Sequence, residues 1–418
     1  KWSGTRRPAG GLDRRVRRAI VDDHTPQEAN RASWPAGDAF ALVPRAGHAA
    51  GVDQQVVEQI LSEVEQAVRA RFWEGAPRSE PSGAGVDEID AQTVLSNCAD
   101  VTPVLTNRGE MIAAEQPGLA LIQQGGKRWR PLLLVLVCRM CGGQRRQEEQ
   151  AVEVAAAVEL AHSGSLIIDD IEDGADLRRG EPTAHHRFGL DAAVNGGNLL
   201  YCVPGQIFSS AGLPAEVELE VHRLYWQALV RLHYGQGLDI SWHRDRGRMP
   251  NVDEYLAMCR LKSGSSSGLA ARLGAMLAGA DPAVCDSLAL AGEDFGVCFQ
   301  IIDDVRNLTT GNPGKMRGDD LVEGKKSLPL LLAVASGERE ASRLGALLRE
   351  LVDSEEGGGR DALIEEAIAA MEAVGSIERA RDLAQRRYRD TRERLQALAA
   401  VEGLALGALL SLTDRLIA

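Results

Sequence analysis

Residues 152–168 read VEVAAAVELAHSGSLII and run directly into the acidic stretch Asp169-Asp170-Ile171-Glu172-Asp173. Apolar and small residues at helical spacing predict a helix over this segment. On such a helix Asp169 and Asp173 are four residues apart and share a face, where like charges repel. A magnesium ion held between the two carboxylates would explain this arrangement. A solvated acidic turn is the alternative interpretation of the same pattern.

A second acidic stretch, Asp303-Asp304-Val305-Arg306-Asn307, repeats the spacing, with Asn307 in place of the last carboxylate. It follows the largely apolar run VCFQII at 297–302. These acids therefore emerge from a buried helix, where an unpaired charge is costly. Two such stretches that face one cavity predict a site where metal ions hold a diphosphate.

Basic residues accompany both acidic stretches and also form a third element. Arg178 and Arg179 follow the first stretch, whereas Lys315, Lys325 and Lys326 follow the second. The third element, GGKRWRP at 125–131, opens a Leu- and Val-rich run. Its glycines allow close backbone approach, and free N–H groups at a helix start beside Lys and Arg bind anions. Each group taken alone is also consistent with ordinary surface bases.

The remaining sequence predicts an all-α protein. Helical periodicity is clear over 56–68, 152–168, 217–232, 269–277, 287–308 and 377–398. No convincing period-two strand is present in the sequence. Residues 1–50 are rich in Arg, Pro and Gly and are predicted to form a mobile tail. We therefore expect one large helical domain over 51–418, with its motif-bearing core at 105–335.

Composition excludes several classes of function. The net charge of -13 argues against a nucleic-acid-binding protein. Seven scattered Cys do not form a disulfide framework, so we expect a cytoplasmic protein. Cys138 and Cys141 lack a second ligand pair and are predicted to pack in the core. No apolar run has the length of a transmembrane segment.

Taken in order, these motifs resemble those of the trans-prenyl diphosphate synthases, the polyprenyl synthetase family. The matches are GGKRWRP, both acidic stretches, Leu177-Arg178-Arg179-Gly180, Gly235-Gln236, Lys262-Ser263, Phe299-Gln300 and GKKSLP at 324–329. The resemblance implies an all-α helical bundle around a central cavity and a homodimer. It also implies a magnesium-dependent prenyltransferase, with about three ions per active site, that condenses isopentenyl diphosphate with an allylic diphosphate.

The resemblance also assigns roles to individual residues. The metal site would comprise Asp169, Asp170, Asp173, Asp303 and Asp304. The allylic diphosphate would contact Arg178, Lys262, Ser263, Gln300, Lys315 and Lys325. Among these, Lys262, Ser263 and Gln300 would offer dipoles to the allylic cation. Isopentenyl diphosphate would be bound by Gly126, Lys127, Arg130, His162 and Arg179.

Product length is expected to depend on the residues below the first acidic stretch. Shorter-product relatives place bulky aromatics one turn before it, whereas this chain has Gly164 and Ser165. A deeper tunnel floor, at Tyr201, would allow geranylgeranyl diphosphate, with farnesyl or a longer chain as alternatives. Gly164 and Ser165 are equally consistent with close helix packing alone.

Two other functions are considered. A class I terpene cyclase would use a similar cavity but would need a different second metal motif, which the sequence lacks. A regulatory subunit of a hetero-oligomeric synthase would usually have lost one acidic stretch, and here both are present.

Overall fold

The computed structural model describes residues 48–72, 108–245, 247–311, 317–353, 358–398 and 404–417. These residues belong to one compact unit, Gly37–Ala418. The predicted tail at 1–50 lies outside them apart from the first residues of α1, and Lys315 also lies outside them.

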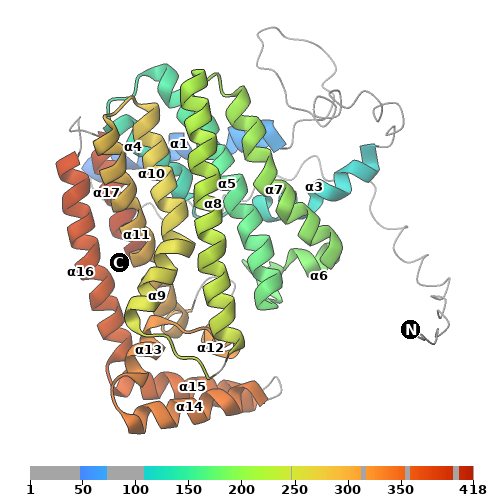
Figure 1. Cartoon of the computed structure of the whole chain (residues 1–418), viewed down its shortest axis with the longest axis vertical. Coiled ribbons are helices and arrows are strands. Elements are labelled where there is room, and N and C mark those ends of the chain that lie inside the picture. Colours follow the sequence, from blue (N-terminus) through green and yellow to red (C-terminus); the bar gives the residue numbers. More distant parts are fainter. Residues whose placement is uncertain are drawn as a thin grey trace, which may run out of the picture. The chain divides into compact units, whose positions relative to one another are not determined.

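The described residues are almost entirely helical, which confirms the predicted all-α class (Figure 1). Each of the six predicted helical ranges falls within an observed helix. In chain order the helices are α1 (His48–Phe72), α3 (Arg108–Gln123), α4 (Trp129–Met140), α5 (Arg145–Asp173), α6 (Ala184–Phe188), α7 (Leu190–Ser210), α8 (Ala215–Arg244), α9 (Val252–Cys259), η3 (Arg260–Gly264), α10 (Ser265–Leu277), α11 (Pro282–Leu308), α12 (Asp319–Glu323), α13 (Leu328–Val334), α14 (Glu338–Asp353), α15 (Gly358–Ala373), α16 (Ser376–Leu398) and α17 (Leu404–Ile417).

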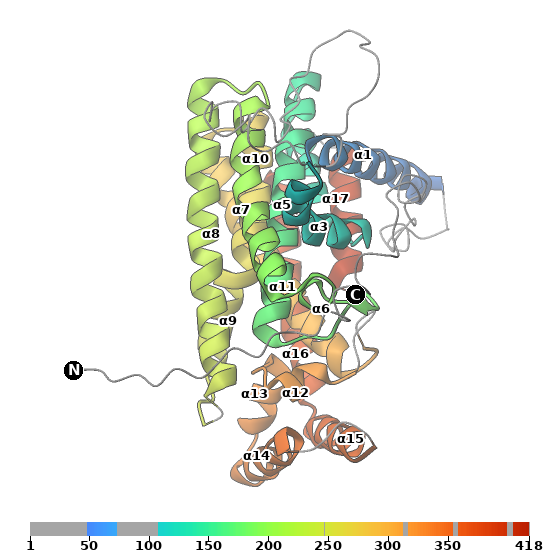
Figure 2. The ribbon, with the colours of Figure 1, turned by 90° about the vertical axis from the view of Figure 1, so that its right-hand side faces the viewer.

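The core is built around α5 and α11, which carry the two acidic stretches. α5 packs against α4, α7 and α10, and α11 packs against α10 and α16 (Figures 1 and 2). Every residue of α4 except Arg139 is buried, as expected for a helix that is apolar on all sides. α12 to α15 lie together at one end of this unit (Figure 2).

Small residues allow these helices to approach closely. A Cβ atom on Gly164 of α5 would lie 2.7 Å from the carbonyl oxygen of Gly197 and 2.9 Å from Cβ of Leu200, both on α7. A Cβ atom on Gly274 of α10 would lie 2.2 Å from the carbonyl oxygen of Leu134 on α4. Close packing through glycine and alanine explains how a chain with so few aromatic residues fills its core.

Two local features were not predicted from the sequence. Strands β1 (Leu177–Arg178) and β2 (Glu181–Pro182) pair antiparallel directly after α5, but they are too short to show a period of two. η3 is a π-helical turn between α9 and α10. The two strands directly follow the acidic end of α5, and η3 carries Lys262, which contacts that end.

α5 is also the one described helix that is long and apolar enough to cross a membrane by composition. Its candidate window is 72% buried inside this protein, as expected for a core helix.

Candidate active site

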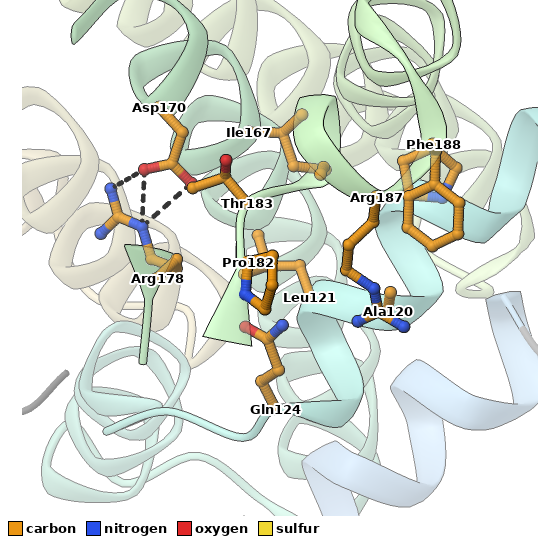
Figure 3. Close-up of a pocket in the computed structure, with 12 residues that line it drawn as sticks. Ala120, Leu121, Gln124, Ile167, Asp170, Arg178, Pro182, Thr183, Arg187 and Phe188 are labelled. Atoms are coloured by element: carbon orange, nitrogen blue, oxygen red, sulfur yellow. Dashed lines mark hydrogen bonds and ion pairs between the residues drawn. The ribbon is translucent and has the colours of Figure 1, made fainter. Parts of the chain in front are cut away.

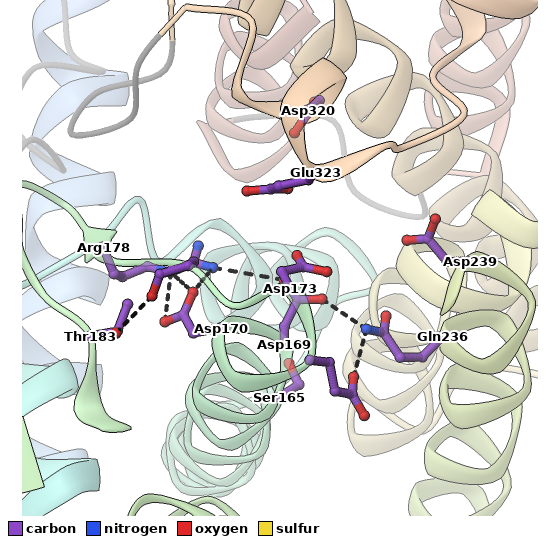
Figure 4. Close-up of polar contacts among 12 residues, drawn as sticks. Ser165, Asp169, Asp170, Asp173, Arg178, Thr183, Gln236, Asp239, Asp320 and Glu323 are labelled. Carbon is purple, nitrogen blue, oxygen red and sulfur yellow. Dashed lines mark hydrogen bonds and ion pairs between the residues drawn. The ribbon is translucent and has the colours of Figure 1, made fainter. Parts of the chain in front are cut away.

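The first acidic stretch forms the last turn of α5. Gly174 ends the helix with a φ of 65°, a left-handed conformation that favours glycine. Carboxylates at this position lie at the negative end of the helix dipole, so they require nearby cations. Figure 4 shows the acids of this turn facing polar groups from α8 and α12.

Lys262 provides the cation next to Asp169. Its Nζ lies 3.2 Å from Asp169 Oδ1 and 2.7 Å from Oδ2 of Asp239, which is on α8. Burial lowers the pKa of Lys262, but the two carboxylates outweigh burial and raise it overall. For Asp169, burial raises the pKa, but Lys262 and other nearby cations lower it overall. Both groups are therefore charged.

A glycine and a π-helical turn bring Lys262 to this position. A Cβ atom on Gly235 of α8 would lie 2.4 Å from the backbone nitrogen of Lys262. Only glycine lets α8 pack this closely on η3, where Lys262 lies. The next residue, Gln236, donates hydrogen bonds to Asp169 (3.0 Å) and Glu172 (2.7 Å) (Figure 4). The Gly235-Gln236 pair thus joins α8 to both the acidic turn and η3.

Asp173 contacts a second lysine. Nζ of Lys325 lies 2.8 Å from Asp173 Oδ2, 2.6 Å from Glu323 and 3.7 Å from Asp320. The Oδ2 atom of Asp173 is buried, and the ammonium of Lys325 pairs with it. Burial, followed by the negative charge of Asp169, raises the pKa of Asp173 to about 6. Three carboxylates therefore surround one ammonium group.

Asp170 is buried and pairs with Arg178 of β1. Nε of Arg178 donates to both carboxylate oxygens, at 2.8 and 3.1 Å, and Nη2 donates to Oδ1 (Figures 3 and 4). The same guanidinium lies 3.7 Å from Asp169. Asp170 therefore orients Arg178 toward the acidic turn. A pocket beside this pair is lined by residues of α3, α5, α6 and the two strands, together with Gln124 (Figure 3).

The second acidic stretch lies near the end of α11, and its members have different surroundings. Buried Asp304 accepts hydrogen bonds from Tyr255 (2.6 Å), Gln300 (3.1 Å) and the backbone N–H of Leu328 (3.1 Å). Burial raises the pKa of Asp304 to about 7. Asp303, in contrast, is half-buried and makes no hydrogen bond or ion pair with any described residue.

Asn307, which replaces the last carboxylate of this stretch, is fully buried. Neither polar atom of its side chain has a hydrogen-bond partner in the described structure. Asp303, four residues earlier, is only partly buried.

Ser263 and Gln300 form a chain between η3 and α11. Oγ of Ser263 donates to Oε1 of Gln300 (2.7 Å), and the amide of Gln300 donates to Asp304. Because Lys262 precedes Ser263, the three residues predicted to face the allylic cation lie together. Ser263 supplies the hydroxyl that this chain of hydrogen bonds needs.

A separate cationic cluster lies at the start of α4. Arg130 contacts Nε2 of His162 (3.1 Å) and donates to Ser266 (2.9 Å), and its guanidinium stacks over Trp129. Burial, followed by the charges of Arg130 and neighbouring arginines, holds the pKa of His162 well below its usual value. His162 is therefore neutral, and Arg130 carries the charge.

Lys127 and Arg179 complete the cationic cluster. Nζ of Lys127 lies over the ring of Phe299, 5.2 Å from its centroid, so the loop reaches α11. Arg179 donates to the carbonyl oxygen of Gly125. A Cβ atom on Gly126 would lie 2.7 Å from the Arg179 guanidinium, so this glycine admits the arginine. The predicted isopentenyl diphosphate residues are therefore brought together.

The acidic residues fit a hard cation. Within the described residues no three acids, cysteines or histidines converge closely enough to bind an ion, and ammonium groups contact Asp169 and Asp173. Asp303 makes no hydrogen bond or ion pair with a described residue and is half-buried. Carboxylate oxygens beside phosphate-binding bases are the donor set that magnesium prefers.

Several residues of this site had no assigned role from the sequence. Gln236 was only a motif match, and Asp239, Tyr255, Asp320 and Glu323 had no signal of their own. Spacing gives a weak signal for Asp239, which lies one helical turn after Gly235 on α8. Tyr255 and the α12 acids reach the site only through tertiary packing.

Comparisons with known proteins agree with this geometry. The polyprenyl synthetase family model matches residues 113–368. The chain is 35% identical to geranylfarnesyl diphosphate synthase of Aeropyrum pernix, over 64% of this chain and 86% of that protein. It is 30% identical to geranylgeranyl diphosphate synthase of Sulfolobus acidocaldarius, over 71% of this chain and 88% of that protein.

Solved structures share the fold. A polyprenyl synthase from Caulobacter crescentus CB15, in complex with calcium and isoprenyl diphosphate, is 26% identical. It superimposes with a TM-score of 0.67 over 90% of this chain and 99% of that one. The chain belongs to the polyprenyl synthetase family and is a prenyltransferase that makes prenyl diphosphates.

Proposed function

We propose that this prenyltransferase condenses isopentenyl diphosphate with an allylic diphosphate and releases geranylgeranyl diphosphate. The observation that carries the proposal is the presence of two separate sites for anions. One is lined by carboxylates that alternate with Lys262 and Lys325. The other is purely cationic and is centred on Arg130. A condensing enzyme needs two diphosphate sites, whereas a terpene cyclase needs only the first.

Asp169, Asp173 and Asp303 are the proposed magnesium ligands, because their carboxylates are accessible or incompletely paired. Bound magnesium would stabilise the charge that develops on the departing diphosphate. Asp170 and Asp304, which the family resemblance places in the metal site, have supporting roles in this proposal. Each is buried and already saturated by protein donors, so each orients a neighbour, Arg178 or Gln300.

Arg178, Lys262 and Lys325 are proposed to bind the allylic diphosphate. Each now neutralises a carboxylate of the first stretch. Metal binding at Asp169 and Asp173 would free Lys262 and Lys325 for phosphate oxygens, whereas Asp170 would continue to orient Arg178. Lys315 retains this role as a prediction from the family motif alone.

The groups facing the allylic carbon are proposed to be Lys262, Ser263 and Gln300. The hydroxyl and amide dipoles are fixed in advance by their mutual hydrogen bond and by Asp304. Dipoles that need no reorganisation stabilise a developing cation most effectively. The double bond of isopentenyl diphosphate then attacks this cation, and the released diphosphate accepts the proton that is lost.

Isopentenyl diphosphate is proposed to bind at Lys127, Arg130 and Arg179, against Gly126. Neutral His162 supports Arg130 without adding charge. The positive charge of Arg130 is influenced by Asp303, so the two sites are electrostatically linked. This link supports the proposal that the two substrates bind side by side.

Product length is proposed to depend on Ser165 and Tyr201 rather than on Gly164. Gly164 is turned toward α7, where it permits close packing. Ser165 lies one turn below Asp169 and donates to the carbonyl oxygen of His162 (2.7 Å). Tyr201 is buried and packs edge to face on His233, with ring centroids 5.4 Å apart. This aromatic pair is the proposed tunnel floor.

We also propose that the protein is a cytoplasmic homodimer. α8 carries a stripe of exposed apolar side chains, comprising Leu219, Trp226, Val230, Tyr234 and Leu238. Trp226 is 50% exposed and Tyr234 is 70% exposed. Large aromatics at helical spacing are typical of interface cores. The described cysteines are all free thiols, which suits a reducing compartment.

A product assay tests the proposed chain length. The chain is incubated with magnesium, isopentenyl diphosphate and dimethylallyl, geranyl or farnesyl diphosphate in turn. The products are then dephosphorylated and separated by chromatography. Geranylgeraniol from all accepted starters is expected. Accumulation of farnesol alone, or of longer alcohols, would contradict the proposed length while leaving the condensation intact.

A further inference from the structure

The loop that presents the cationic cluster has a strained backbone. Gly125, Gly126 and Arg128 have φ values of 78°, 138° and 47°. Glycine adopts such values freely, but a side chain such as arginine does so rarely. A residue in this conformation persists only when its surroundings hold it there. Arg128 lies between Lys127 and Arg130, so its backbone sets the directions of both.

Two contacts hold Arg128 in place. Its Nη1 donates to Oε1 of Glu159 on α5 at 2.5 Å, and its Nη2 donates to the carbonyl oxygen of Ile122 at 2.7 Å. The side chains of Arg128 and Glu159 are only 2% and 4% exposed. The guanidinium therefore joins the last turn of α3 to α5, across the loop that it belongs to.

Arg179 is the other described non-glycine residue with positive φ, at 56°. It also binds this region, because its Nη1 donates to the carbonyl oxygens of Gly125 and of Leu121 (3.3 Å). The two guanidinium groups thus donate to carbonyl oxygens in the last turn of α3 and in the loop that follows it. Both strained arginines thus anchor one loop.

Glu159 is the nearby anion that balances this group. Four arginines, at 128, 130, 178 and 179, each contribute to the lowered pKa of His162, which lies one turn after Glu159 on α5. Burial lowers the pKa values of Arg130 and Arg179, and the negative charge of Glu159 raises both. Glu159 makes its hydrogen bond to Arg128, so Arg128 is the arginine of this group that the buried carboxylate neutralises directly.

We infer that the buried Arg128–Glu159 pair is a positioning device for the isopentenyl diphosphate site, which fixes the left-handed loop so that Lys127 and Arg130 point at one diphosphate. The inference rests on the proposed function. The pair itself touches no substrate. It acts on the binding of one substrate only, because the allylic site is held by a different set of contacts on η3, α8 and α12.

The test uses a double variant that removes both charges, Arg128→Met with Glu159→Gln. Removing both partners avoids the unpaired buried charge that a single substitution would leave. We expect KM for isopentenyl diphosphate to rise at least about tenfold, with kcat and the allylic KM within about twofold of the parent. The matched control is Arg139→Met with Glu148→Gln. That pair joins α4 to α5 at their other ends, at 3.0 Å, and should leave all constants unchanged.

A second comparison isolates the backbone conformation. In the Glu159→Gln background, Arg128→Gly restores a residue that adopts positive φ freely. Its KM for isopentenyl diphosphate should fall below that of the Met variant, although the cavity left is larger. A purely structural role for the pair predicts the reverse order.

The outcomes are distinguishable. A folded double variant with the parent's KM for isopentenyl diphosphate would overturn this inference and leave the proposed function standing. A parent chain that does not consume isopentenyl diphosphate would overturn the proposed function itself. If the double variant does not fold, Arg128→Lys carries the test, because Lys keeps the charge but cannot bridge two acceptors as a planar fork does. An unchanged KM in that folded variant would also overturn the inference.

Discussion

Lys325 holds its ammonium nitrogen 2.8 Å from the buried Oδ2 of Asp173, in an ion pair. The lysine thus lies where the carboxylates of α5 and α12 need positive charge. A metal ion bound by Asp173 would remove that need and release Lys325 for phosphate.

This relationship predicts that magnesium with inorganic diphosphate stabilises the folded chain. At about 100 times the dissociation constant, binding contributes about 2.7 kcal/mol, which should appear as an increase in Tm of several degrees. Asp173→Asn should abolish the increase. Asp176→Asn is the matched control, since Asp176 follows the same stretch but its side chain is 75% exposed. Differential scanning fluorimetry measures both, and an undiminished shift in the Asp173 variant would contradict the metal assignment.

Gly164 and Ser165 should respond differently to substitution. Gly164→Ala places a methyl group against Gly197 and Leu200, so it should destabilise the fold by about 1–3 kcal/mol without changing the product. Ser165→Phe should shorten the product, because the ring would enter the tunnel below Asp169.

Denaturant unfolding and product chromatography make this comparison. Ser165→Ala is the control for loss of the hydroxyl and should keep the product length of the parent. A shorter or longer product from Gly164→Ala would show that this glycine faces the tunnel after all.

The buried, neutral state of His162 predicts a pH dependence of stability. Its folded pKa lies well below the unfolded value of 6.5, first because of burial and then because of Arg130. Below pH 6.5 the unfolded chain therefore takes up a proton that the folded chain does not. Stability from this group is present above pH 6.5 and is lost as the pH falls, by at most about 1.4 kcal/mol per pH unit.

His162→Gln removes this titrating group, so the variant should lose less stability than the parent as the pH falls from 6.5 to 5. The measurement is the free energy of unfolding of parent and variant across this range. Equal slopes for the two proteins would mean that His162 is not held neutral.

The exposed stripe on α8 predicts a dimer that a charge can disrupt. Trp226→Asp should give a monomer in sedimentation velocity, because an unpaired carboxylate would be buried at the interface. Leu290→Asp on α11 is the control, since Leu290 is 51% exposed but lies outside the stripe. A parent chain that sediments as a monomer would refute the proposed homodimer.

The sequence predicts the helices well because each is indicated by the spacing of apolar residues within its own segment. The α5 and α11 patterns and both acidic stretches could be identified without tertiary information. The partners of those acids could not, because Gln236 and Lys262 are 67 and 93 residues away from Asp169. Gly164 shows the same limit, since a glycine before the acidic turn suits either a tunnel or a helix contact. Only the structure shows that Gly164 faces Leu200 of α7.

The most direct test of the central claim is the turnover of farnesyl diphosphate with magnesium, in the presence and absence of isopentenyl diphosphate. The account predicts that farnesyl diphosphate is consumed only when isopentenyl diphosphate is present, and that the product is geranylgeranyl diphosphate. Consumption without isopentenyl diphosphate, with release of a hydrocarbon, would contradict it and indicate a cyclase. Absence of turnover under both conditions would contradict the assignment of Asp169, Asp173 and Asp303 to catalysis.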